Sequence, residues 1–332
     1  MSRQTVLVTG GMGCIGAGTV KWLIDHTDAN IVVCSRTASS DRVARVFPAF
    51  STERLSIVAI DVTDSASLVQ LIRSRDVTRV VHLAALQTPD CNANRDLGLQ
   101  INLAGTQNLL EAIKQAAPEF ERFVFASSIA VYGERAAYPA GTVPLQAAPA
   151  PVNAYGVWKI AGEHLCRIFT KETGIPAISL RPGVLFGPGR DAGLTSTPTT
   201  AMKCIALGQP YTIPFRSRQD YLYAPDVGAA FGHVVMSDFS GYDVFTLPSR
   251  TLTTNQFVSA LVTAADELNL NHQCEIQIGD EEVPFICDLD YSDFQRAFPD
   301  APHTALNKAL RESLQVFREH VQRGWLTTED IA

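Results

Sequence analysis

A tyrosine and a lysine stand four residues apart in the stretch AYGVWKIAGEHL, as Tyr155 and Lys159. Side chains at this spacing lie on one face of a helix, so the phenol and the ammonium group can act together. Free tyrosine has a pKa of about 10, and a nearby cation favours the phenolate and lowers that pKa. The pair therefore predicts a base that takes a proton from a hydroxyl group at neutral pH, although chance surface pairs of this kind are common in helices.

Two adjacent serine hydroxyls could assist such a proton transfer. Ser127 and Ser128, in the stretch FASSIAVYG, follow an apolar run that predicts a strand. A hydroxyl at the end of a strand in a parallel sheet lies where ligands bind and can donate a hydrogen bond to the reacting oxygen. The alternative is that both serines only form the turn that ends the strand.

Three glycines follow the first apolar run, in the stretch TGGMGCIG. They let the backbone turn tightly and approach a pyrophosphate, which the N–H groups and dipole of the next helix would bind. An ordinary glycine-rich turn is the alternative, but the place after the first strand of an alternating pattern favours a dinucleotide. We expect the pyrophosphate to contact Gly10, Gly13, Cys14, Ile15 and Gly16.

With a nicotinamide bound, Tyr155 would take a proton from an alcohol while the hydride leaves to the cofactor, and Lys159 would also hold the ribose.

The end of the second predicted strand bears on the choice of dinucleotide. A carboxylate there would bind both ribose hydroxyls and favour NAD, but the chain has Ser35 and Arg36. A hydroxyl followed by a guanidinium suits a 2′-phosphate, so we favour NADP and keep NAD as the alternative. Arg36 could instead be a solvated arginine or stack on the adenine. Asp61 and Val62, after the third strand, are expected beside the adenine, although Asp61 could equally cap the next helix.

A repeating order of strands and helices must hold these residues in place. Short apolar runs predict strands at 5–10, 31–35, 55–60, 79–85 and 122–128, with helices between them that include 65–73 and 99–116. Nearly continuous apolar strands that alternate with helices are typical of a parallel sheet covered on both faces. With right-handed crossovers, the sequence predicts an α/β, doubly wound, Rossmann-type fold.

The pattern changes after Arg181. Residues 181–199 are rich in glycine, proline and threonine and predict a long functional loop. Thr253 and Gln256 form a capping-box pattern ahead of apolar residues at helical spacing. We therefore predict a dinucleotide-binding domain over 1–180 and a smaller mixed α/β substrate lobe over 181–332, with a segment near 241–250 returning to the sheet.

Composition argues against several classes of function. The 332 residues carry a formal net charge of −7 without a long basic run, so nucleic acid and anionic membranes are poor partners. No apolar run reaches the roughly 18 residues of a membrane span. A strand that begins by residue 5 leaves no room for a signal peptide. Seven cysteines without a CxxC pattern predict reduced thiols in a cytoplasmic protein and no metal site.

The chain resembles an extended short-chain dehydrogenase/reductase of the NAD-dependent epimerase/dehydratase group. The resemblance rests on six segments between residues 8 and 189: VTGGMGCIG, VVHLAA, INLAGTQNLLEA, FASSIAVYG, YGVWK and LRPGVLFGPG. It implies hydride transfer at a secondary alcohol or carbonyl of a sugar or polyol. In that reaction Ser128 would be the catalytic hydroxyl, Tyr155 the acid/base and Lys159 its partner. It also implies a homodimer, formed through the helices around 102–116 and 155–172.

The same resemblance implies further binding residues. The cofactor is expected to contact Tyr155, Lys159, Leu83, Ala84, Ala85 and Asn102. The sugar-like substrate is expected to contact Ser128, Gln87, Arg190 and Gln219.

Two departures from the family narrow the expected function. Ile129 and Ala130 follow Ser128 where sugar dehydratases usually have an acidic pair, and neither side chain can move a proton. Gln219 stands where nucleotide-sugar enzymes usually have an arginine, and an amide cannot replace a bidentate guanidinium on a diphosphate. Arg218 lies one residue away, which reverses its direction in an extended segment unless the segment bulges. A free sugar, a sugar acid or another small polyol is therefore the expected substrate.

Three functions stay open at this point. An epimerase would return the hydride to the opposite face of its substrate and end with its cofactor unchanged. A dehydrogenase or reductase would release the changed cofactor, and the Ser35–Arg36 strand end leans towards this reading. A non-catalytic dinucleotide sensor could dispense with Ser128, Tyr155 and Lys159, all of which are present.

Overall fold

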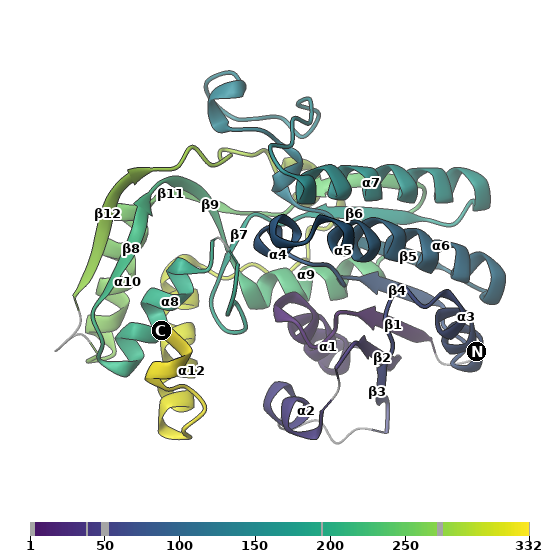
Figure 1. The fold of residues 1–332 in the computed structure, drawn as a ribbon, viewed down its shortest axis with the longest axis horizontal. Coiled ribbons are helices and arrows are strands. Elements are labelled where there is room, and N and C mark those ends of the chain that lie inside the picture. Colours follow the sequence, from purple (N-terminus) through teal and green to yellow (C-terminus); the bar gives the residue numbers. More distant parts are fainter. Residues whose placement is uncertain (1–3, 38, 48–52, 194, 271–274, 332) are drawn as a thin grey trace.

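A sheet of seven parallel strands forms the larger of two lobes in the computed structural model, which describes residues 4–37, 39–47, 53–193, 195–270 and 275–331 (Figure 1). The spatial order is β10-β6-β5-β4-β1-β2-β3, and each pairing is parallel. The strands are β1 (Thr5–Thr9), β2 (Asn30–Ser35), β3 (Leu55–Ala59), β4 (Arg79–His82), β5 (Arg122–Ala126), β6 (Ala177–Arg181) and β10 (Tyr242–Thr246). The predicted doubly wound fold is confirmed.

Helices cover both faces of this sheet because successive strand residues point to opposite sides. On one face, Val6 and Val8 of β1 pack with α1 (Cys14–His26), α9 (Ala224–Met236) and α11 (Ser292–Ala297). On the other face, Leu7 packs with α3 (Ser65–Ser74), α6 (Gly105–Ala116) and α7 (Ala154–Thr173). The short helix α2 (Ser40–Val46) follows β2.

The helix expected at 99–116 starts earlier and is interrupted. It is preceded by α4 (Thr88–Ala93) and α5 (Arg95–Leu99), and a π-helical turn, η1 (Gln100–Ala104), joins α5 to α6. A π turn widens the helix locally and is common at functional sites. Here it carries Asn102, whose contacts are described below.

The smaller lobe contains two short sheets and three main helices. One sheet joins β11 (Arg250–Thr253), β9 (Arg218–Tyr223) and β7 (Val184–Phe186), and the other pairs β12 (Ile276–Glu282) with β8 (Tyr211–Arg216). They pack with α8 (Thr197–Leu207), α10 (Thr254–Glu267) and α12 (Leu306–Gln322) around a separate apolar core. The predicted capping box of Thr253 and Gln256 is present at the start of α10.

The stretch after Arg181 is not the continuous loop that its glycines and prolines predict. Val184, Leu185 and Phe186 are buried and pair with β9 as strand β7. Further along, Tyr242–Thr246 pairs with β6 as the edge strand β10 of the large sheet. The division of the chain into domains at residue 180 stays a prediction.

A crevice opens where the strand order reverses. The chain passes from β1 outward to β2 and β3, and then crosses to β4 on the other side of β1. Ligands of doubly wound proteins bind beyond the carboxyl ends of the strands at this point, here β1 and β4. In Figure 1 the smaller lobe stands beside this end of the sheet.

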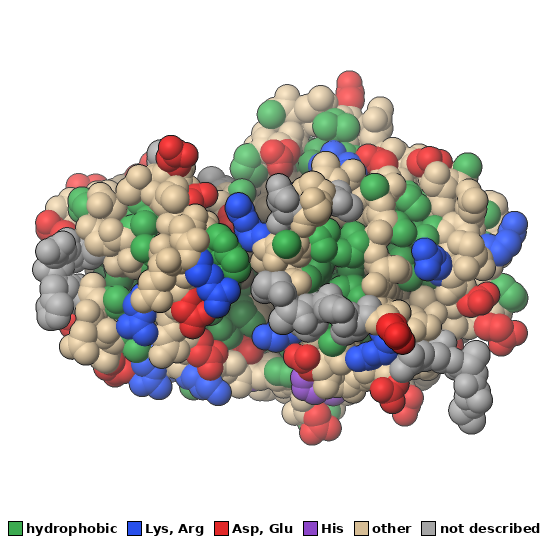
Figure 2. Space-filling model, turned by 90° about the horizontal axis from the view of Figure 1, so that it is seen from below, with side chains coloured by type: hydrophobic (Ala, Val, Ile, Leu, Met, Phe, Trp, Pro, Cys, Tyr) green, Lys and Arg blue, Asp and Glu red, His purple; other side chains and the backbone are tan. Residues whose placement is uncertain are grey.

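The described residues contain no helix that is long and apolar enough to cross a membrane, and no group of three or more metal-ligating side chains. On the face shown in Figure 2, basic and acidic side chains are interspersed rather than gathered by sign. Short 3₁₀ helices, η2 (Ile129–Val131), η3 (Arg135–Ala137) and η4 (Thr328–Ile331), complete the described structure.

Candidate active site

A cavity of about 590 Å³ occupies the crevice between the two lobes. Its walls come from the start of α1, the ends of β2, β4 and β5, the start of α7 and the segment 283–286 of the smaller lobe. Of the residues predicted to bind cofactor or substrate, all except Asp61, Asn102 and Gln219 line this cavity.

The glycine segment has the shape of a pyrophosphate cradle. A Cβ atom at Gly16 would lie 2.4 Å from the carbonyl oxygen of Gly10, so only glycine allows the helix to pack this closely. Gly13 is the N-cap of α1 and has no side chain to bind the first N–H groups of the helix. Those groups have no partner within the helix, and the helix dipole favours an anion beside them. The cradle therefore fits a dinucleotide pyrophosphate.

Two guanidinium groups line the cavity where the ribose of the cofactor is expected. Ser35 and Arg36 line it as predicted, and Arg42 of α2 joins them. Arg42 donates hydrogen bonds to Thr37 Oγ1 at 3.2 Å and to Met12 O at 3.5 Å. Sequence reasoning missed Arg42 because only the turn after β2 brings this helix back over the strand end.

On the adenine side, the structure separates the two residues predicted together. Val62 lines the cavity, whereas the Asp61 carboxylate accepts hydrogen bonds from Thr63 N at 2.9 Å and Thr63 Oγ1 at 2.8 Å. Asp61 thus stabilises the turn before α3, and Asp64 caps that helix by accepting from Ser67 N. Leu83, Ala84 and Ala85 line the cavity after β4.

Asn102 acts on the chain beside the cavity rather than on the cavity itself. Its Oδ1 accepts from Leu86 N at 2.7 Å, and its Nδ2 donates to Leu86 O at 3.0 Å. The buried amide therefore holds the backbone next to Gln87, which does line the cavity.

Ser128, Tyr155 and Lys159 all line the cavity, and both Ser128 and Lys159 contact Tyr155. Tyr155 stands in the first turn of α7, which Asn153 caps by accepting a hydrogen bond from Gly156 N at 2.9 Å. A Cβ atom at Gly156 would lie 2.1 Å from Ala130 O, so glycine lets this turn contact the segment that carries Ser128. Between the two candidate serines, Ser128 faces the phenol, while Ser127 is buried and donates to Glu163.

Burial and polar neighbours act in opposite directions on the pKa of Tyr155. Burial raises the pKa of Tyr155 above its usual value, while the Ser128 hydroxyl and the charge of Arg190 lower it. Lys159 Nζ lies 5.4 Å from the centre of the Tyr155 ring and donates to Ala126 O at 2.7 Å. Burial also lowers the pKa of Lys159 to about 8. The phenol is thus protonated at neutral pH in this structure.

A buried ion pair lies further along α7 from Tyr155 and Lys159. Glu163, two turns after Tyr155 on α7, accepts from Arg181 Nε and Nη2, both at 2.7 Å. Arg181 Nη1 donates to Tyr132 OH at 2.6 Å. This network ties α7 to the ends of β5 and β6, and local sequence patterns do not reveal it.

The candidate substrate residues separate into two groups. Arg190 Nη1 donates to Gln87 Oε1 at 2.9 Å, and both side chains line the cavity. Gln219 is 1% exposed on β9 and donates to Ser217, away from the cavity. Arg218 points the other way, as the strand geometry predicts, and is half exposed.

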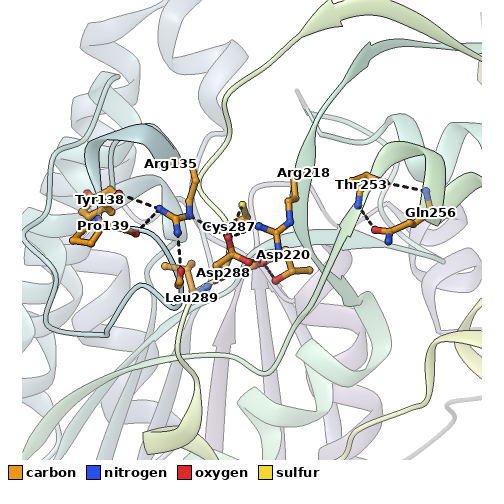
Figure 3. Close-up of polar contacts among 12 residues, drawn as sticks. Arg135, Tyr138, Pro139, Arg218, Asp220, Thr253, Gln256, Cys287, Asp288 and Leu289 are labelled. Atoms are coloured by element: carbon orange, nitrogen blue, oxygen red, sulfur yellow. Dashed lines mark hydrogen bonds and ion pairs between the residues drawn. The ribbon is translucent and has the colours of Figure 1, made fainter.

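Asp288 and Asp220 hold the wall that the smaller lobe contributes (Figure 3). Asp288 Oδ2 accepts from Arg135 Nε at 3.1 Å and from Arg218 Nη1 at 2.6 Å. Asp220 is buried and accepts from the backbone N–H groups of Asp288 and Leu289, each at 3.0 Å. These contacts fix the segment after residues 283–286 against both β9 and the loop of Arg135.

Comparison with known proteins places this geometry in a family. The sequence model of the NAD dependent epimerase/dehydratase family matches residues 6–245. D-erythronate dehydrogenase of Cupriavidus necator is 32% identical over 191 residues, which cover 54% of this chain and 57% of that protein. The match thus spans little more than half of that relative. dTDP-L-rhamnose 4-epimerase of Burkholderia thailandensis is 25% identical over 79% of this chain and 81% of its own length.

Solved structures support the fold. The UDP-N-acetylglucosamine 4-epimerase of Methanobrevibacter ruminantium M1 superposes with a TM-score of 0.81 at 24% identity, over 96% of this chain and 100% of that one.

Proposed function

Because the chain belongs to the NAD dependent epimerase/dehydratase family, we propose that it transfers a hydride between a nicotinamide dinucleotide and a secondary alcohol or carbonyl of a small sugar-like substrate. The observation that carries the proposal is the meeting of Ser128, Tyr155 and Lys159 in one cavity with a dinucleotide cradle. A binding protein without catalysis would have no need for these three side chains at one point.

Each polar side chain has a distinct role in the proposed reaction. The nicotinamide, when bound, accepts or donates the hydride. Tyr155 moves the proton of the reacting oxygen, and Ser128 donates a hydrogen bond to the same oxygen. With its pKa raised by burial, Tyr155 is protonated at neutral pH and is ready to donate its proton to a carbonyl. In oxidation, Ser128 and Arg190 favour the phenolate that Tyr155 must form.

Two further features support a small substrate without a nucleotide. Ile129 and Ala130 follow Ser128, so no acidic pair is present there for loss of water. The smaller lobe contributes the uncharged residues 283–286 to the cavity, while Arg218 and Arg216 are engaged with Asp288 and Asp280. Among the described residues, the smaller lobe therefore brings one arginine to the cavity, Arg190 on the loop between β7 and α8, and none from β8 or β9.

For the cofactor we propose a preference for NADP. Arg36 and Arg42 line the ribose end of the cavity, and no carboxylate of the described residues lines it there. An exchangeable NADP favours a dehydrogenase or reductase over an epimerase. The epimerase remains the second candidate, since the relative matched over most of its length is an epimerase.

Replacement of Tyr155 by phenylalanine tests the chemistry. We expect Tyr155→Phe to lower kcat roughly 10²- to 10⁴-fold, the usual contribution of a general acid or base. Binding of NADPH, followed by fluorescence titration, should stay unchanged. Tyr211→Phe, outside the cavity, is the control. Near-normal turnover by Tyr155→Phe would contradict the proposed mechanism.

The cofactor released by denaturing freshly purified protein separates the two candidates. Stoichiometric NAD or NADH in the mass spectrum would indicate a retained cofactor and an epimerase. Protein that is empty and then binds NADPH more tightly than NADH would indicate a dehydrogenase or reductase.

We also propose a homodimer and a cytoplasmic location. The dimer rests on exposed apolar side chains of α5 and α7. The location rests on buried cysteine thiols, such as Cys34, Cys91 and Cys166, which persist in reducing compartments. Cys274 lies outside the described residues.

A further inference from the structure

Arg190 brings a guanidinium group into the cavity on the loop between β7 and α8. Its Nη1 donates to Gln87 Oε1 at 2.9 Å, and its Nη2 donates to Thr195 Oγ1 at 3.2 Å. Both partners are uncharged, and all three side chains line the cavity. Arg190 and Tyr155 line the same cavity, and the charge of Arg190 lowers the pKa of Tyr155.

This guanidinium has no carboxylate partner among the described residues. The neighbouring carboxylate, Asp191, pairs instead with Lys203 Nζ at 2.7 Å. The Nε atom of Arg190 is buried and makes no hydrogen bond. A buried charge and a buried unpaired donor both cost free energy unless a partner satisfies them. The arrangement therefore leaves room for one more anionic group.

The charges around the cavity show where that anion belongs. Arg36 and Arg42 serve the ribose end, and the pyrophosphate cradle has its own N–H groups at the start of α1. The charge of Arg190 acts both on Cys14 at the start of α1 and on Tyr155, so Arg190 lies between the cradle and the phenol, and residues 283–286 add no charge to the cavity. Glu134 is the one carboxylate among the described residues that line the cavity. The lining of the cavity thus has an excess of positive charge, to which Arg190 contributes.

We propose that Arg190 binds the carboxylate of the substrate, so that the substrate is a small sugar acid. The fork of a guanidinium matches a carboxylate, and Nε together with a second nitrogen can donate to both oxygens. Gln87 and Thr195 hold the fork in place, and Asn102 holds the backbone beside Gln87.

This inference rests on the proposed hydride transfer and adds the substrate class. In the oxidation of such an acid, the carbinol C–H bond breaks and its hydride passes to NAD(P)⁺. The hydroxyl proton passes to Tyr155, and the C–O bond becomes a carbonyl. The carboxylate on Arg190 takes no part in this exchange and only sets which hydroxyl reaches Tyr155.

The main competitor for Arg190 is the cofactor pyrophosphate. Gly189, the preceding residue, packs against Cys14 at the start of α1, with its Cβ position 3.4 Å from Cys14 Cα. A guanidinium that bound the pyrophosphate would change cofactor affinity and would not distinguish a sugar acid from its neutral parent. These two readouts separate the two roles.

The experiment compares aldonates and uronates with the neutral sugars and alditols from which they derive. Turnover is followed by NAD(P)H absorbance, and binding to the cofactor-loaded protein is followed by calorimetry. The variants are Arg190→Gln, which removes the charge, and Arg190→Lys, which keeps the charge without the fork. Arg75→Gln, an exposed arginine after α3, is the matched control.

We expect the wild type to prefer acids over their neutral parents. Arg190→Gln should weaken binding and kcat/KM for the acids by on the order of 10²-fold, as expected when one partner of a buried charge pair is removed. Arg190→Lys should recover part of this loss, and cofactor affinity should stay unchanged.

Equal losses on acids and neutral sugars, or a parallel loss of cofactor affinity, would overturn the inference. So would a wild type that prefers neutral sugars. Binding of acids that depends on Arg190 without any NAD(P)-linked turnover would support the inference and count against the proposed function. A failure of the inference about Arg190 can therefore be distinguished from a failure of the proposed hydride transfer.

Discussion

At the scale of single residues, Lys159 carries its amino group into the interior of the larger lobe. It is 3% exposed, donates to Ala126 O and lies 5.1 Å from the centre of the Phe125 ring. Burial lowers its pKa from 10.5 to about 8, because water no longer stabilises the charge. The positive charge of buried Lys159 therefore destabilises the folded protein. The position of Lys159 beside Tyr155 makes this cost necessary.

This cost gives the stability a defined pH dependence. Between pH 8 and 10.5 the folded protein has released the Lys159 proton while the unfolded chain still binds it, so the free energy of unfolding contributed by this group rises with pH. Below pH 8 the Lys159 amino group is protonated in both the folded and the unfolded chain, so its full cost to the free energy of unfolding remains.

We therefore expect Lys159→Met to be more stable than the wild type at pH 7 and to lose this advantage towards pH 10.5. Urea unfolding of both proteins between pH 7 and 10.5 measures the difference in their free energies of unfolding. The contributions of the other titrating groups cancel in this difference. Curves that stay parallel would show that the amino group does not have a lowered pKa.

The two arginines at the ribose end lead to a prediction on cofactor choice. Arg36→Asp should reverse the expected preference for NADPH over NADH, since a carboxylate repels the 2′-phosphate and accepts hydrogen bonds from ribose hydroxyls. Loss of a charge-assisted hydrogen bond should weaken NADPH binding roughly 10- to 100-fold. Arg45→Asp, on α2 but outside the cavity, is the control. An unchanged ratio of NADPH to NADH affinity would exclude this role for Arg36.

At the scale of elements, α7 is the helix on which the site depends. Its first turn holds Tyr155, its second holds Lys159 and its third holds Glu163, which is paired with Arg181 of β6. One helix therefore carries the proposed proton-transfer group, Tyr155, and the glutamate of the ion pair that ties the helix to the sheet.

Removal of one partner from this pair should be strongly destabilising. We expect Glu163→Gln to lower the free energy of unfolding by about 3 kcal/mol or more, because Arg181 then keeps a buried charge without its counter-charge. Denaturant unfolding measures the change. Glu172→Gln, on the same helix and paired with Lys114 at the surface, should cost less than about 1 kcal/mol.

A double variant completes this test. Arg181→Met combined with Glu163→Gln should recover part of the loss, since no unpaired charge remains. Simple addition of the two single effects would show that the pair does not act as a unit.

At the scale of the whole molecule, an apolar surface crosses α5 and α7, which contact one another. Leu97 and Leu99 of α5 and Val157 and Ile168 of α7 are 38 to 48% exposed. Large apolar side chains gathered on adjacent helices mark an interaction surface.

We expect the wild type to be a dimer in light scattering after gel filtration, and Val157→Glu with Ile168→Glu to be a monomer. Thr263→Glu, on the exposed side of α10, should leave the dimer intact. A monomeric wild type at micromolar concentration would contradict the proposed assembly.

Local patterns of the sequence determined much of the larger lobe. The apolar runs of β1 to β5, the glycines before α1 and the spacing of Tyr155 and Lys159 all depend on residues close together in the chain. Periodicity, helix capping and glycine geometry act over a few residues, so the sequence alone predicts them. The choice between Ser127 and Ser128 came from resemblance, and the buried contact of Ser127 with Glu163 agrees with it.

Only the tertiary structure decided which distant groups meet. Arg42 joined the ribose end, Asp61 and Gln219 turned away from the cavity, and Arg181, Asp220 and Asp288 became anchors of its walls. It also showed that burial raises the pKa of Tyr155. These outcomes depend on crossovers and on the depth of each side chain, and neither is a property of neighbouring residues in the chain.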